Sequence, residues 1–102
     1  MNRVPLTDGT GRWFDESKAE KFTEDTYWDG HNHISKATGS QWDHESLYYT
    51  AGKQWVKYSS SQWEGHGEGY ELIDADKAAV WLVTNGEQHP AVAEEIASLE
   101  IT

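Results

Sequence analysis

The chain has 102 residues, no cysteine, and a formal net charge of −10 from 18 acidic and 8 basic side chains. This length is usual for one domain and short for two, and the absence of cysteine excludes disulfides and thiolate metal sites. We therefore expect a single domain over residues 1–102. The N-terminal residues contain no apolar run typical of a signal peptide or a membrane span, so we expect this domain in the cytoplasm.

The N-terminal third predicts an extended segment, a helix and a strand. Residues 1–11 end in a glycine-rich turn. Asp15 is a good N-cap residue, and Ala19 and Phe22 follow it at helical spacing, which predicts a helix over residues 15–25. Asp29-Gly30 is a turn signal, after which we expect a strand over residues 33–38.

The clearest β signal is a hairpin in the middle of the chain. Residues 44–50 and 54–60 alternate in polarity and flank the short connection Ala51-Gly52-Lys53. Alternation places Leu47 and Tyr49 on one face of the first strand. Residues 70–73 predict a last strand, which completes a meander of three or four strands.

The C-terminal segment predicts two helices. Asp74 is a good N-cap for a helix over residues 75–84, and Asn85-Gly86 provides a stop signal. Pro90 begins the final helix. The predicted fold class is therefore α+β, with an N-terminal helix, a three- to four-stranded antiparallel β-meander and two C-terminal helices, which cover one face of the sheet.

The sequence contains no catalytic signature. Its serines lie in no nucleophile-elbow motif, and neither glycine-rich segment is followed by the lysine of a phosphate loop. We therefore expect no enzymatic activity and no cofactor. His31 and His33 are weak candidates for a metal site with nearby carboxylates, and the alternative is that both are polar loop residues.

Tryptophan is the strongest anomaly, because six tryptophans are too many for one small core. We expect Trp13 and Trp81 in the core. Trp42, Trp55 and Trp63 lie among polar residues, so we expect some of them to be partly exposed, as in interface hot spots or sugar-stacking platforms. The alternative is that the second sheet face is covered by a loop or by a twin subunit in a homodimer.

The negative charge lies mainly in the second half of the chain. Residues 1–57 hold nine acids and seven bases, whereas residues 58–102 hold nine acids and only Lys77. Such a surface attracts basic proteins and repels nucleic acid and membranes, although it can also serve solubility alone. The predicted binding residues are Trp42, Trp55, Trp63, Glu64, Glu68, Glu71, Asp74 and Asp76.

These observations predict a protein-interaction module with a basic protein partner. A sharper form of this hypothesis is an inhibitor of a nucleic-acid-binding protein, of the anti-CRISPR or anti-restriction type, that mimics nucleic acid. The alternatives are a carbohydrate-binding domain that uses exposed tryptophans, and a metal site at His31 and His33.

Four segments of the chain resemble a pattern found in small uncharacterised bacterial proteins. They are Gly11-Arg12-Trp13-Phe14-Asp15, Trp28-Asp29-Gly30-His31-Asn32-His33-Ile34-Ser35, Gly39-Ser40-Gln41-Trp42 and Ser61-Gln62-Trp63. The resemblance covers residues 11 to 86 and implies no activity, cofactor or site residue.

Overall fold

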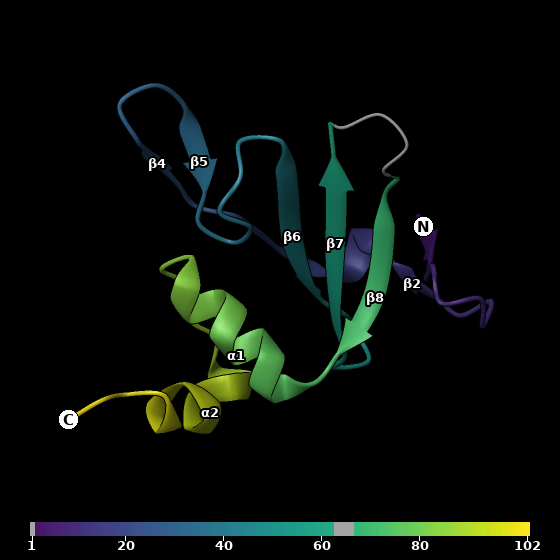
Figure 1. The fold of residues 1–102 in the computed structure, drawn as a ribbon. Coiled ribbons are helices and arrows are strands. Elements are labelled where there is room, and N and C mark those ends of the chain that lie inside the picture. The colour runs from purple at the N-terminus through teal and green to yellow at the C-terminus, as the bar shows by residue number, and fades with distance from the viewer. Residues whose placement is uncertain (1, 63–66) are drawn as a thin grey trace.

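The computed structural model describes residues 2–62 and 67–102 and is rich in β-strands (Figure 1). Within these residues eight strands form three sheets, followed by two short α-helices. The elements are β1 (Arg3–Pro5), β2 (Trp13–Asp15), the 3-10 turn η1 (Glu16–Lys18), β3 (Glu20–Thr23), β4 (Thr26–Trp28), β5 (His33–Ser35), β6 (Asp43–Tyr49), β7 (Trp55–Ser61), β8 (Gly69–Ile73), α1 (Ala75–Thr84), the 3-10 turn η2 (Pro90–Val92) and α2 (Ala93–Ser98). None of the helices in the described residues has the length and apolar character needed to cross a membrane.

The centre of the molecule is an antiparallel sheet in the order β3-β6-β7-β8. The predicted hairpin is confirmed as β6 and β7, and its tight connection places Lys53 at a positive φ of 64°. The register pairs Tyr49 with Trp55 and Leu47 with Lys57. Paired residues share one face of a sheet, so this register determines which side chains meet on each side.

Both faces of the central sheet are covered by the chain itself. On one face, Leu47 and Trp55 pack against helix α1 through Trp81 and Leu82. On the other face, Tyr48 and Val56 pack against the β1–β2 hairpin, which contributes Val4, Leu6 and Phe14. The second face is thus covered by the N-terminal segment and needs no twin subunit.

The predicted fold class is wrong, because no N-terminal helix forms over residues 15–25. Asp15 does act as an N-cap and accepts a hydrogen bond from the Ser17 N–H, but the turn ends at Lys18. The chain then becomes strand β3, in which Phe22 pairs with Leu47 of β6. An isolated helix of this length is marginal, whereas a strand satisfies the otherwise open backbone edge of β6.

The two C-terminal helices are observed in their predicted places. Helix α1 covers residues 75–84 as predicted, and its N-cap Asp74 accepts a hydrogen bond of 2.8 Å from the Lys77 N–H. Asn85 ends the helix and is 4% exposed. Its side chain donates to the Trp81 carbonyl at 2.8 Å and accepts from the Asp25 N–H at 2.9 Å. Asn85 therefore joins the end of α1 to the segment between β3 and β4.

Candidate functional site

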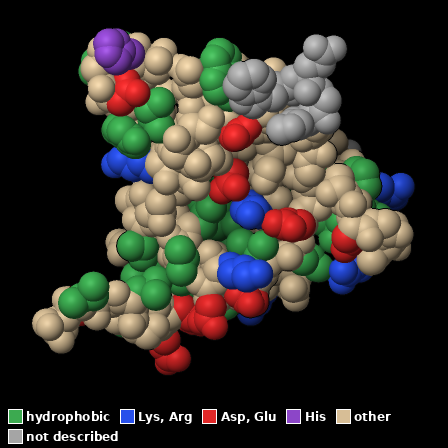
Figure 2. Space-filling model, in the orientation of Figure 1, with side chains coloured by type: hydrophobic (Ala, Val, Ile, Leu, Met, Phe, Trp, Pro, Cys, Tyr) green, Lys and Arg blue, Asp and Glu red, His purple; other side chains and the backbone are tan. Residues whose placement is uncertain are grey.

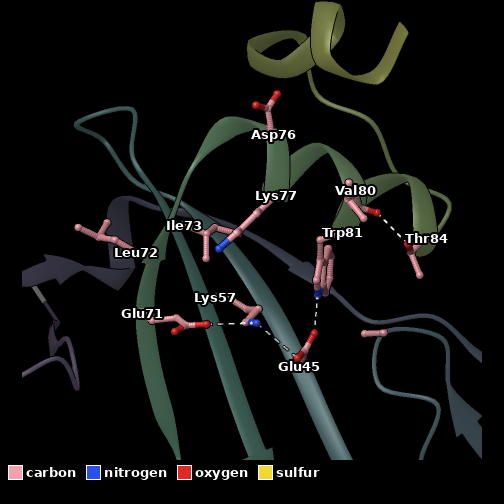
Figure 3. A pocket seen from close by; sticks show the side chains of 11 residues that line it. Glu45, Lys57, Glu71, Leu72, Ile73, Asp76, Lys77, Val80, Trp81 and Thr84 are labelled. Carbon is pink, nitrogen blue, oxygen red and sulfur yellow. Dashed lines mark hydrogen bonds and ion pairs between the residues drawn. The ribbon is translucent and has the colours of Figure 1, made fainter. Parts of the chain in front are cut away.

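A groove lies between helix α1 and the central sheet, on the face opposite the β1–β2 hairpin (Figure 3). Its volume is about 490 Å³, which is within the range of small-molecule sites. The helix contributes Val80 and Trp81 to one wall, and β8 contributes Ile73. The groove exists because α1 covers only part of this sheet face, so the polar residues on the remaining part reach solvent.

Three charged side chains from neighbouring strands form the floor of the groove. The Lys57 ammonium lies 3.2 Å from Glu71 Oε1 and 3.8 Å from Glu45 Oε2. The Trp81 indole N–H donates to Glu45 Oε1 at 3.1 Å, which fixes this carboxylate from the helix side. Because Glu45, Lys57 and Glu71 stand on β6, β7 and β8, the register of the sheet brings them together. The floor is a preorganised row of alternating charge.

Two further charged residues of α1 line the groove and lie differently. Lys77 extends from the helix toward the floor, whereas Asp76 is directed out of the groove, on the side of α2 (Figure 3). Of the predicted binding residues, Glu71 and Asp76 thus line the groove. Glu68 lines an adjoining hollow that shares Glu71, and Asp74 is occupied as the N-cap of α1.

The acidic side chains beyond β8 lie on the two helices and in the segments that flank them, and we call this set of residues the acidic helical layer. Figure 2 shows acidic side chains along the lower edge of the molecule, over α1 and α2. Val80, Val83 and Leu99 are exposed apolar residues of the same segment. None of the acids of this layer forms an ion pair with another described residue. The layer consists of Asp74, Asp76, Glu87, Glu94, Glu95 and Glu100.

Two of the tryptophan predictions are wrong. Trp55, expected as a surface platform, is 5% exposed, because the helices cover the sheet face on which it lies. Trp13, expected in the core, is 49% exposed, because its neighbour Phe14 takes the inward position on β2. Trp81 is buried as predicted, and Trp42 is 41% exposed. Trp55 is therefore not available for the predicted sugar-stacking platform of Trp42, Trp55 and Trp63.

The remaining site predictions fall on Trp63 and Glu64, which lie outside the described residues, and on the two histidines. Both histidines lie in the β4–β5 hairpin and are exposed. The His33 ring packs against Trp28 with ring centroids 5.1 Å apart. Across residues 2–62 and 67–102, no three His, Asp or Glu side chains gather as metal ligands would.

The sequence reasoning missed Glu45, Lys57 and Lys77 as groove residues. A usable signal was present for the first two, since the alternation of the hairpin places Glu45 on the same strand face as Leu47. A charged residue on a face that a helix covers needs a charged partner, and the three-residue connection fixes the register that supplies Lys57. No comparable sequence pattern predicts that Lys77 lines the groove.

Comparisons with known proteins found no match among protein-family models, curated proteins or solved structures. The resemblance to small bacterial proteins therefore stays a prediction.

Proposed function

We propose that this chain is a protein-interaction module that binds a basic partner protein through its acidic helical layer. The observation that carries the proposal is the charge of residues 74–102, where six acids face only Lys77, a net charge of −5. Carboxylates without basic neighbours attract a cationic surface and repel nucleic acid and anionic membranes. Val80, Val83 and Leu99 add exposed apolar area, and apolar area beside charge is typical of protein interfaces.

The partner class that we favour is a nucleic-acid-binding protein, which the chain would inhibit in the manner of anti-restriction or anti-CRISPR proteins. Evenly spread over the surface of 6737 Å², the net charge of −10 gives one charge per about 670 Å². Duplex DNA carries roughly one charge per 100 Å² of its surface. Residues 74–102 hold half of the net charge in 29 of the 102 residues, so charge in this layer is more concentrated than an even spread would give. The proposal needs no cofactor, and the cysteine-free composition favours a cytoplasmic setting.

A capture experiment with charge-neutral variants tests the proposal. We expect the immobilised chain to retain a basic protein from host lysate at about 50 mM salt and to lose it at about 300 mM. The double variant Glu94→Gln/Glu95→Gln removes two charges from the acidic helical layer and should weaken this capture.

The matched control is Asp8→Asn/Glu16→Gln, which removes two charges beside the β1–β2 hairpin and should bind as the wild type does. Capture that is indifferent to salt, or equal losses in the two double variants, would contradict the proposal.

A further inference from the structure

With Asp76 directed out of the groove, the four charges that face it are balanced but separated in space. Glu45 and Glu71 lie on the floor with Lys57 between them, and Lys77 reaches toward them from the helix (Figure 3). Lys77 forms no ion pair with any described residue. The groove therefore presents carboxylate oxygens on the sheet side and an unpaired ammonium on the helix side.

We propose that the groove binds a small zwitterion, meaning a molecule that carries one ammonium and one carboxylate on an apolar body, as the apolar amino acids do. The ligand ammonium pairs with the carboxylates of Glu71 and Glu45, and the ligand carboxylate pairs with Lys77. The apolar body packs against Ile73 and Val80 on the two walls. The groove borders the acidic helical layer, because Asp76 and Val80 line it, but the proposal does not rest on the function proposed above.

Charge complementarity favours this ligand class over simpler ones. A ligand with only a positive charge would leave Lys77 without a counter-charge, and a ligand with only a negative charge would lie against Glu45 and Glu71. An uncharged apolar ligand would displace water from all four charges without replacing its hydrogen bonds, which is costly. A zwitterion replaces that water at both ends.

Glu45 and Lys57 are held in place on the floor, whereas Glu71 and Lys77 are exposed and free to adjust. The side chains of Glu45 and Lys57 are 18% and 27% exposed, and Trp81 fixes Glu45 through its indole N–H. Lys77 is exposed, and its flexible stem can move toward a bound carboxylate. A volume of about 490 Å³ admits an amino acid of the size of leucine. For so small a ligand we expect a Kd of about 1 mM or tighter.

Titration with three related probes tests the ligand class. L-leucine carries both charges, N-acetyl-L-leucine lacks the ammonium, and L-leucinamide lacks the carboxylate. The readout is the NMR signal of the Trp81 indole N–H, which contacts Glu45 on the groove floor and which Trp81→Phe identifies. We expect L-leucine to give a saturable shift below about 10 mM, and each blocked probe to bind at least about tenfold more weakly.

Variants test the residues, with calorimetric titration of L-leucine as a second measurement. Lys77→Met should lower the affinity at least about tenfold, because the carboxylate loses its partner, and Glu71→Gln should lower it on the ammonium side. Lys18→Met removes an exposed lysine of η1 and should bind as the wild type does.

The absence of a saturable shift with L-leucine would overturn the proposal, as would equal binding of a blocked probe or unchanged binding by Lys77→Met. Because partner capture through Glu94 and Glu95 is measured separately, failure of either proposal can be told from failure of the other.

Discussion

The central sheet is covered by two layers, and these layers differ in how far their acidic side chains are paired within the chain. Residues 2–18, on one face, hold three acids and three bases. Asp8 pairs with Arg12 at 3.1 Å, and Asp15 accepts hydrogen bonds from Ser17 and from the Asn2 N–H. Hydrogen bonds from Thr10 and from Ser17 lower the pKa of Asp8 and of Asp15, respectively. In the acidic helical layer on the other face, the carboxylate of the cap residue Asp74 is the only one that accepts a hydrogen bond from a described residue.

The carboxylates of the N-terminal layer therefore bind groups within the chain, whereas most of those in the acidic helical layer remain available to a partner. The acids of the N-terminal layer fix turns and loops, so their charge is largely used within the chain. The acids of α2 and of the C-terminal residues fix nothing within the described chain, so their repulsion is uncompensated. This available negative charge is the physical basis of the proposed interaction.

The largest predicted effect compares the packing of the two layers. Leu82→Ala removes a side chain with 0% exposure from the interface between α1 and the sheet, and we expect the free energy of unfolding to fall by about 3 kcal/mol. Val4→Ala, in the three-residue strand β1, removes less volume at 9% exposure and should cost about 1.5 kcal/mol. Urea denaturation followed by tryptophan fluorescence measures both. Equal losses would show that the N-terminal layer contributes as much as the helices.

The second effect concerns the buried amide of Asn85, which joins the end of α1 to the segment between β3 and β4. Asn85→Ala leaves the Asp25 N–H and the Trp81 carbonyl without their partner, and should cost about 2 kcal/mol in unfolding free energy. Thr84→Ala is the control, because the exposed Thr84 hydroxyl donates only to the Val80 carbonyl within the same helix. We expect this control to lose less than about 0.5 kcal/mol. Similar losses in both variants would contradict the tethering role of Asn85.

The third effect separates the one structural acid of the acidic helical layer from its neighbour. Asp74→Ala removes the N-cap of α1 and should lower the free energy of unfolding by about 1 kcal/mol. Asp76→Ala removes an acid of the first turn whose carboxylate accepts no hydrogen bond from the described residues, and should cost only about 0.3 kcal/mol. Thermal unfolding of the two variants at low salt measures the difference. A larger loss for Asp76→Ala would mean that its charge also stabilises the fold.

Local signals predicted the C-terminal part of the fold better than the N-terminal part. The cap Asp74 and the stop at Asn85 bound helix α1 at the predicted residues, because both act within one turn of the helix. The segment after Asp15 carried a real cap signal, but its conformation depends on pairing with β6, which lies more than twenty residues further along the chain. The same long-range packing decides the exposure of Trp13 and Trp55.

The groove was predicted only in part for the same reason. Glu71 follows from the acidic C-terminal half, and Asp76 was found on the same basis. The register of the sheet places Glu45 and Lys57 in the groove, and the angle at which α1 crosses the sheet places Lys77 there. Such relations between distant elements leave no local pattern in one sequence.

The smallest effect at neutral pH, and one specific to the N-terminal layer, concerns Tyr70. Its ring lies 4.7 Å from Tyr58 and 6.0 Å from Phe14, between centroids, and burial raises the pKa of Tyr70 to about 12. Tyr70→Phe should therefore change the free energy of unfolding by less than about 0.5 kcal/mol at pH 7. Above its ordinary pKa of 10.0 the unfolded chain releases the Tyr70 proton first, so wild-type stability falls as the pH rises from about 10 to about 12.

The phenylalanine variant lacks this proton and should lose less stability over that range in urea denaturation at stepwise higher pH. Burial also raises the pKa of Tyr48, so part of the loss should remain. The wild-type slope is the reference, and Tyr27→Phe, at a side chain that is 48% exposed, controls for the loss of a tyrosine hydroxyl. If Tyr70→Phe kept the wild-type slope, the β1–β2 hairpin would not exclude water from the tyrosines, and the N-terminal layer would be as open to solvent as the acidic helical layer.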